Sequence, residues 1–144
     1  MNIRIASIDD SKLLAEMNAQ LIRDEGHRNS MTPAKLENRV MSWLARSEYE
    51  AVIFEDGDAT TGYALFRRCD DHVYLRQFFV APEFRRRGVG ASALAWLWSK
   101  PWRDTPRIRI DVLVGNDVAA KFWQSVGFEP YCTTMEMQSP SRLS

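Results

Sequence analysis

The segment RRRGVG at residues 85–90 combines three consecutive arginines with two glycines that are one residue apart. The residues that follow are good helix formers and run up to Pro101, so the glycines stand where a helix begins. A helix N-terminus presents N–H groups without helical partners and a partial positive charge, and both favour phosphate. Glycine has no Cβ that would block a ligand from these N–H groups, and arginine donates to phosphate oxygens through a planar fork. The segment therefore predicts a binding site for a phosphate ester.

Two common phosphate-binding motifs do not account for this segment. A P-loop requires GxxxxGK followed by Ser or Thr, and a dinucleotide fingerprint requires three glycines in GxGxxG order. Neither pattern is present here. An alternative without any ligand is that Gly88 and Gly90 only shape a tight strand-to-helix turn while the arginines are solvated.

Hydrophobic periodicity predicts the elements that position this segment. The expected order is β-α-α-β-β-β-α-β-α-β, an α/β (α+β) arrangement in which the three middle strands form an antiparallel meander. The predicted ranges, in chain order, are 2–7, 7–26, 32–45, 50–56, 60–68, 72–80, 85–100, 107–114, 116–126 and 128–138.

Length and composition are typical of one globular domain, with 144 residues, 45% hydrophobic and 26% charged. We expect a single domain over residues 1–138 and a loose tail over 139–144. Nineteen Lys plus Arg balance nineteen Asp plus Glu, which argues against binding nucleic acid through a basic surface. Cys69 and Cys132 lie far apart and form no CxxC pair, so they suggest neither a zinc site nor a disulfide framework, and no metal is expected.

The N-terminal residues lack the apolar core of a signal peptide, and no apolar run approaches the roughly 18 residues of a membrane span. We therefore expect a cytoplasmic protein without membrane contact. The aromatic content is compatible with a homodimer. Four tryptophans are expected in the core or an interface rather than stacked on a ligand: Trp43, Trp96, Trp98 and Trp102.

Two segments resemble the GNAT N-acetyltransferases. FFVAPEFRRRGVGASAL, residues 78–94, is similar to the family's acyl-CoA-binding segment, whose signature [QR]xxGx[GA] follows a strand that ends Val-x-Pro; Arg85, Gly88 and Gly90 fill it. NDVAAKFWQSVGF, residues 116–128, is similar to the family pattern N-x-x-A-x-x-x-aromatic-x-x-x-G-F. The resemblance, which covers nearly the whole chain, implies the GNAT fold, a mixed central sheet with a splayed pair of parallel strands that holds the cofactor.

The resemblance also implies acetyl-CoA as co-substrate. It places the pantetheine arm between the strands predicted at 72–80 and 107–114, and the pyrophosphate on the main chain of residues 85–91. Instead of contacting the cofactor, Asn116 could serve only as a helix cap, and Trp123 could simply be buried. The residues assigned to the cofactor are Phe78, Val80, Arg85, Arg86, Arg87, Gly88, Val89, Gly90, Ala91, Asn116 and Trp123.

The implied reaction is transfer of an acetyl group to a primary amine of a small molecule or peptide by direct attack. Trp123 stands where many family members have a tyrosine that protonates the leaving thiolate, and an indole N–H has no useful acidity. The candidates that remain for this proton are Tyr131, Tyr74, Ser125 or a water, and an unassisted departure is the alternative.

The sequence also leaves several candidates for the general base. Arg76 occupies a strand position where some members carry an acidic base, so the candidates are Glu25, Asp24, His27 and Glu55. Residues 22–29 border the acceptor site in the family. They form either an acidic rim for a cationic amine or a solvated loop after a helix that ends at Gly26.

Two other functions compete with catalysis. A non-catalytic acyl-CoA-binding or sensor module of the same fold would explain the missing tyrosine. Binding of nucleic acid through the arginine run is disfavoured by the neutral net charge.

Overall fold

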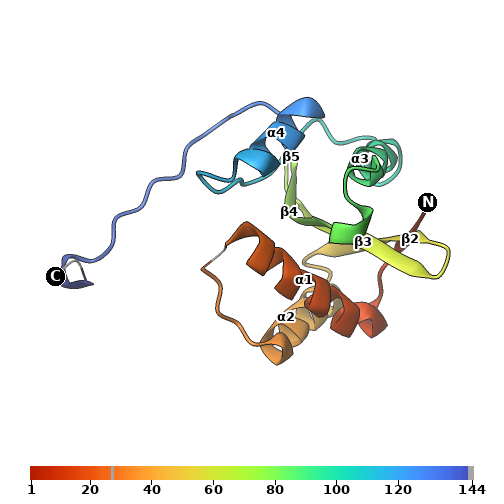
Figure 1. The fold of residues 1–144 in the computed structure, drawn as a ribbon, viewed down its shortest axis with the longest axis horizontal. Coiled ribbons are helices and arrows are strands. Elements are labelled where there is room, and N and C mark those ends of the chain that lie inside the picture. Colours follow the sequence, from red (N-terminus) through yellow and green to blue (C-terminus); the bar gives the residue numbers. More distant parts are fainter. Residues whose placement is uncertain (27, 143–144) are drawn as a thin grey trace. The chain divides into compact units, whose positions relative to one another are not determined.

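The computed structural model describes residues 1–26 and 28–142. The chain divides into two compact units, residues 1–113 and 114–144, and each unit is described by itself. The first unit contains a five-stranded sheet in the order β1-β2-β3-β4-β5 (Figure 1). The strands are β1 (Asn2–Ile5), β2 (Glu50–Asp56), β3 (Ala59–Arg68), β4 (Val73–Val80) and β5 (Ile108–Arg109).

The first four strands pair antiparallel with their neighbours, which confirms the predicted meander. β4 and β5 pair parallel, but their ladder contains only Val73 opposite Ile108 and Tyr74 opposite Arg109. The strand predicted at 107–114 was therefore too long. β4 carries a bulge immediately after these pairs, and a bulge bends its strand and increases the local twist, so the two strands part there.

Helices cover both faces of this sheet. α1 (Ser11–Glu25) and α2 (Pro33–Ala45) lie against one face, and α3 (Val89–Ser99) lies on the other (Figure 1). Their ends follow the predicted signals. Gly26 terminates α1 in the left-handed region at φ 63°, and the hydroxyl of Thr32 accepts a hydrogen bond of 3.3 Å from the main-chain N–H of Lys35 at the start of α2.

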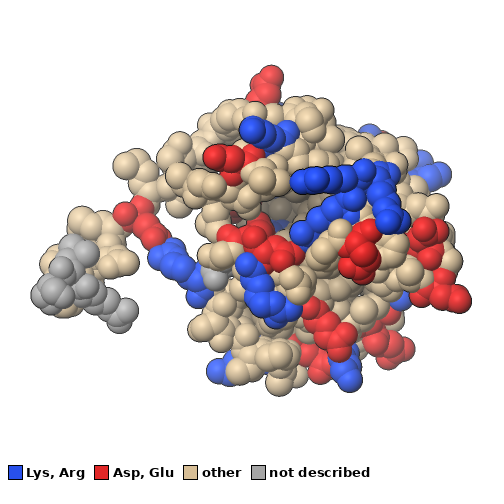
Figure 2. Space-filling model, viewed as in Figure 1, with Lys and Arg blue, Asp and Glu red and all other residues tan. Residues whose placement is uncertain are grey.

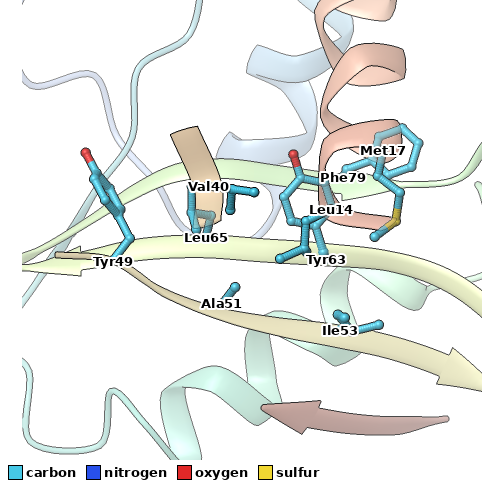
Figure 3. Close-up of a cluster of buried hydrophobic side chains, with 9 residues drawn as sticks. All are labelled: Leu14, Met17, Val40, Tyr49, Ala51, Ile53, Tyr63, Leu65 and Phe79. Carbon is cyan, nitrogen blue, oxygen red and sulfur yellow. The ribbon is translucent and has the colours of Figure 1, made fainter. Parts of the chain in front are cut away.

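The core on the α1/α2 face draws on both helices and on the three central strands (Figure 3). Because side chains alternate along a strand, Ile53 and Tyr63 point toward the helices, whereas Phe54 points to the α3 face. Both sets are buried, as expected for a sheet covered on each side. The members of the α1/α2 cluster are Leu14, Met17, Val40, Tyr49, Ala51, Ile53, Tyr63, Leu65 and Phe79.

The second unit contains α4 (Asp117–Ser125) and a following segment without a described strand. The side-chain oxygen of Asn116 accepts a hydrogen bond of 3.3 Å from the N–H of Ala119, so Asn116 is the helix cap. The ring of Trp123 lies 5.0 Å from that of Phe122 and 5.2 Å from that of Phe128.

The final strand predicted over residues 128–138 was wrong, because no described strand includes these residues. A strand needs a neighbour that satisfies its N–H and C=O groups, and the described ladders end at Arg109. Pro130 also removes one donor. The side chains of Tyr131, Met135 and Met137 are 78%, 87% and 83% exposed, so the segment buries no apolar face.

No helix of the described residues is long and apolar enough to cross a membrane. The single domain expected over residues 1–138 stays a prediction.

Candidate active site

The outer edge of β4 carries the main-chain groups of Phe78 and Val80. The N–H of Ala81 donates to the carbonyl of Thr61 over 2.7 Å, so this facing pair is hydrogen-bonded. Hydrogen-bonded and non-hydrogen-bonded pairs alternate in an antiparallel ladder, which makes Phe79 the next residue that bonds to β3. The N–H and C=O groups of Phe78 and Val80 therefore point away from β3, toward the side on which β4 and β5 separate.

A left-handed turn at Gly88 begins α3. Gly88 has φ 79° and ψ 7°, and its carbonyl accepts the hydrogen bond of the Ser92 N–H at 3.0 Å. The N–H groups of Val89, Gly90 and Ala91 precede that first bond and have no acceptor within the helix. A Cβ built on Gly88 would meet no atom within 4 Å, so no protein atom crowds that one position. The turn offers N–H groups and a helix dipole, which favour a phosphate.

The three arginines before this turn have different surroundings. Arg85 donates from Nε to the carbonyl of Val80 at 2.7 Å and from Nη2 to Oδ2 of Asp24 at 2.5 Å. The guanidinium of Arg87 lies 5.8 Å from the centre of the Phe84 ring, which belongs to the short 3₁₀ turn η2 (Pro82–Phe84). Arg86 has φ 63°, an uncommon conformation for a residue with a Cβ. Arg85 is thus bound within the first unit, and its predicted phosphate contact stays a prediction.

The carboxylate of Asp24 is held ionised by its partners. Burial by itself raises the pKa of Asp24, but the hydrogen bonds from Arg85 and Gln20 outweigh it, and the pKa lies below its ordinary value. Gln20 donates to the other carboxylate oxygen at 2.6 Å. A carboxylate with a lowered pKa is a weaker base, so Asp24 is poorly suited to the base role considered from the sequence.

The other predicted catalytic residues are distributed over the chain. Glu25 lies close enough to Tyr63 for its negative charge to help raise the pKa of that buried phenol, after the larger effect of burial. Glu55 accepts from Arg4 at 3.2 Å between β1 and β2 and lies in no described contact with β4. His27 lies outside the described residues.

Three predicted site residues belong to the second unit. Asn116, Trp123 and Tyr131 all follow Leu113, where the first unit ends. The structure brings together residues 78–91 and Asp24 within the first unit. Roles for the three residues of the second unit stay predictions.

A second polar cluster, which the sequence did not reveal, starts from the bulge in β4. Leu65 pairs with Gln77, whereas the next residue of β3, Phe66, pairs with Leu75. Arg76 is therefore the extra residue of the bulge. Bulges re-aim side chains and are common beside active sites.

The bulge sends two consecutive side chains toward the α1/α2 face. Gln77 accepts a hydrogen bond of 2.8 Å from the hydroxyl of Tyr63, and Arg76 donates from Nη1 to the hydroxyl of Tyr49 at 3.2 Å. Both tyrosines belong to the core cluster on that face, and their hydroxyls project to the same side of the sheet (Figure 3). In a regular strand, consecutive side chains would point to opposite faces.

Arg39 of α2 joins this cluster through Trp43, one helical turn later. The guanidinium carbons of Arg39 and Arg76 lie 4.6 Å and 4.9 Å from the centre of the Trp43 ring. Burial, and then the positive charge of Arg76, lower the pKa of Arg39. Within the described part of the chain, the buried Nε of Arg39 has no hydrogen-bond acceptor.

Acidic and basic side chains are interspersed over the face of the molecule seen in Figure 2. This arrangement agrees with the net charge of zero. Among the described residues, no group of three or more His, Cys, Asp or Glu side chains is placed to hold a metal ion. The sites are therefore local groupings of arginines and main-chain donors.

A sequence model of the Acetyltransferase (GNAT) family matches residues 15–128. No curated protein matches the chain. Among solved structures, the chain is similar to a possible acetyltransferase from Clostridium difficile 630, with 17% identity, a TM-score of 0.81, and 96% of each chain covered.

Two further similar structures contain a form of coenzyme A. A predicted acetyltransferase from Clostridium acetobutylicum, solved with acetyl-CoA, has 18% identity, a TM-score of 0.76, and 99% of each chain covered. Aminoglycoside N-acetyltransferase AAC(6')-Iy in complex with CoA has 19% identity and a TM-score of 0.77, with 96% of this chain and 94% of that chain covered. At these identities the likeness is one of fold.

Proposed function

Because this chain belongs to the GNAT family of acetyltransferases, we propose that it transfers an acetyl group from acetyl-CoA to a primary amine of a small molecule or peptide by direct attack. The observation that carries the proposal is that the outward-facing edge of β4 leads, within the same segment of the chain, to the glycine turn that begins α3. The edge suits an extended amide-containing arm, and the turn suits the phosphates that follow it. Acetyl-CoA supplies the acetyl group as a thioester.

The residues of the first unit fit such a co-substrate. We assign to the arm the main-chain groups of Phe78 and the N–H of Val80, whose carbonyl already accepts a hydrogen bond from Arg85. The N–H groups of Val89, Gly90 and Ala91 are assigned to the phosphate oxygens. Arg86 and Arg87 supply additional positive charge beside the same turn. We assign Arg85 to this site as well, with a second role in holding the turn against α1.

The acceptor must lose a proton before or during attack. An alkylammonium has a pKa of about 10.4, so deprotonation at neutral pH costs about 4 kcal/mol. We propose Glu25 as the base, directly or through a water, because Asp24 is committed to Arg85 and Gln20. As the C–N bond forms and the C–S bond breaks, main-chain N–H groups from Phe78 to Val80 are the donors assigned to the developing negative charge.

Tyr74, the candidate for the thiolate's proton that lies in the first unit, donates its hydroxyl hydrogen bond to Asp111 at 2.8 Å. Burial and this hydrogen bond raise its pKa to about 12, which makes it a weak acid for this role. Trp123 replaces the usual tyrosine, and Tyr131 is the candidate that we retain from the sequence. A second candidate function, an acyl-CoA-binding or sensor module without turnover, is favoured by this substitution. The cytoplasmic location, the homodimer and the absence of nucleic-acid partners also stay proposals.

The test is to incubate the purified protein with acetyl-CoA and a broad panel of primary amines, and to measure the released thiol. We expect release that depends on the amine. Acetyl-CoA binding in a calorimeter, together with no thiol release for any amine, would favour the sensor. No binding of acetyl-CoA at all would contradict both functions.

A further inference from the structure

We propose that the cluster of Arg39, Trp43, Tyr49 and Arg76 binds a carboxylate of the acceptor, so that the substrate is a small amine that also carries a carboxylate group. This inference rests on the proposed function and names the substrate class of the same site. It starts from the positive charges of Arg39 and Arg76, which lie at the same indole ring and form no ion pair with any of the described acidic residues.

The two guanidinium groups lie at the same indole ring. Arg39 reaches Trp43 from the preceding turn of α2, and Arg76 reaches it from the bulge of β4. The described ion pairs involve other arginines, including Arg4, Arg68 and Arg85, and include neither of these two. Two like charges are thus held together, and an anion between them would relieve their repulsion.

One donor of this pair is buried without an acceptor. The Nε of Arg39 is inaccessible to solvent and has no hydrogen-bond partner within the described residues. A buried charged donor without a partner is costly, so such a group in a folded protein calls for an explanation. A bound anion that neutralises this guanidinium would explain it. A carboxylate suits the planar fork of arginine.

The surroundings are rigid enough to fix a ligand. Tyr49 is 4% exposed and accepts a hydrogen bond from Arg76, while its ring lies 4.5 Å from that of Trp43. The neighbouring Gln77 is held by Tyr63. An incoming carboxylate would therefore meet arginines whose positions are already restricted, which reduces the entropy lost on binding.

The cluster and the predicted acetyl site share β4. Arg76 precedes Phe78 by two residues, a separation below the roughly 7 Å of a regular strand because the bulge lies between them. A small molecule can span that distance with its carboxylate at the arginines and its amine at the β4 edge.

The same cluster disfavours polycationic acceptors. The acidic rim expected over residues 22–29 is reduced, because Asp24 is already neutralised by Arg85. Arg39 and Arg76 would repel an acceptor with several ammonium groups. An amine with a carboxylate presents one charge of each sign and matches this arrangement.

The experiment compares amines that differ only in this group. Suitable pairs are γ-aminobutyrate and its amide, and ε-aminocaproate and its amide, because the amine in these compounds lies far enough from the carboxylate for its own pKa to change little. We expect kcat/KM to be about tenfold to a hundredfold higher for at least one carboxylate than for its amide. Arg39→Gln and Arg76→Gln should remove this preference by raising KM for the carboxylate much more than KM for its amide.

Arg103→Gln is the matched control, because Arg103 is an exposed arginine of the same unit with only a long 3.8 Å contact to Asp104. It should behave like the parent protein. Equal kcat/KM for carboxylates and amides in the parent, or an unchanged preference in both cluster variants, would overturn the inference while leaving acetyl transfer intact.

A binding measurement covers the case in which no amine is acetylated. N-acetyl-γ-aminobutyrate carries the carboxylate but no free amine, and its binding is measured by calorimetry with and without acetyl-CoA. Binding by the parent that is lost in Arg39→Gln and Arg76→Gln supports the carboxylate site independently of turnover. Absence of binding by the parent under both conditions overturns it.

Discussion

Arg85 and Asp24 form an ion pair, with Nη2 and Oδ2 2.5 Å apart, that joins the turn before α3 to the last turn of α1. The same arginine donates to the carbonyl of Val80. One side chain therefore connects the predicted phosphate turn, the edge of β4 and the helix that borders the predicted acceptor site. Both predicted subsites depend on where this guanidinium lies.

Asp24→Asn tests whether this connection prepares the turn for acetyl-CoA. We expect the affinity for acetyl-CoA to fall about twofold to tenfold, because the turn must then be ordered on binding. The free energy of unfolding should change by less than about 1 kcal/mol, since the pair is partly exposed. Calorimetry with acetyl-CoA measures the first quantity. Tighter binding would instead mean that Arg85 must leave Asp24 to reach the phosphates.

Gly88→Glu tests the phosphate turn. The added carboxylate would occupy the open space before α3 and repel phosphate, so we expect binding of acetyl-CoA to be lost while the circular dichroism spectrum is retained. Gly88→Ala is the control. It adds no charge and should cost about 1 to 2 kcal/mol of stability, because φ is 79°. Unchanged affinity in Gly88→Glu would contradict the assignment.

Trp123→Tyr tests whether the usual general acid can be restored. We expect kcat to rise and its pH profile to gain a decline on the alkaline side, near the tyrosine pKa of about 10. Trp123→Phe, which restores no acidic group, serves as control. Equal rates in the tyrosine variant and the parent would show that protonation of the thiolate does not limit turnover.

Gly62→Ala tests the close approach of β3 to β4. A Cβ at Gly62 would lie 2.0 Å from the carbonyl oxygen of Phe79 and 3.0 Å from the Phe54 ring. The strands would have to move apart, so we expect a loss of about 3 kcal/mol in the free energy of unfolding, measured in urea. Gly57→Ala in the β2–β3 turn is the control, because a Cβ there would meet no atom within 4 Å. It should lower the free energy of unfolding by only about 1 to 2 kcal/mol, the strain of a non-glycine residue at φ 60°. A smaller loss in Gly62→Ala than in Gly57→Ala would be inconsistent with this packing.

Asp10→Asn tests the pH dependence of stability. Hydrogen bonds from Arg4, at 2.9 and 3.0 Å, lower the pKa of Asp10 against the opposing effect of burial. A carboxyl whose pKa is lower in the folded state stabilises the fold at every pH above its ordinary pKa of 3.8. This contribution is lost as the pH falls through the lowered pKa of the folded state. The variant should therefore be about 1 kcal/mol less stable at pH 7 and should show a shallower loss of stability in acid.

The measurement is urea unfolding at a series of pH values from neutral to about 2. Asp104→Asn, at a carboxylate that is 94% exposed, should follow the parent curve. Equal stability of Asp10→Asn and the parent at neutral pH would show that the Arg4 pair contributes nothing.

Local signals predicted most of the fold. Thr32 and Asn116 cap the starts of α2 and α4 through their side chains, and Gly26 ends α1 with a positive φ. The spacing of apolar residues correctly predicted the helices and the meander. The strand at 128–138 failed because alternation alone does not supply a pairing partner. Its Thr and Met residues fit a strand only if another strand lies beside them.

The glycine turn before α3 and the arginine cluster also differed in how far local sequence could predict them. The glycine turn that begins α3 was predictable because Gly88 and its neighbours lie within one short segment, and its binding of phosphate stays a prediction. The cluster of Arg39, Trp43 and Arg76 was not, because it depends on a bulge that no local residue announces and on a contact between α2 and β4. The spacing of Arg39 and Trp43, one helical turn apart, was the only local sign.

The bulge at Arg76 has a consequence for how relatives of this protein can diverge. The pairs on both sides of it, Leu65 with Gln77 and Phe66 with Leu75, would remain in step if another residue replaced Arg76. The register of the sheet thus places no demand on the chemistry of this residue. If Arg76 binds the acceptor as proposed, acceptor preference can change by substitution at this position while the sheet and the proposed acetyl-CoA edge keep their form.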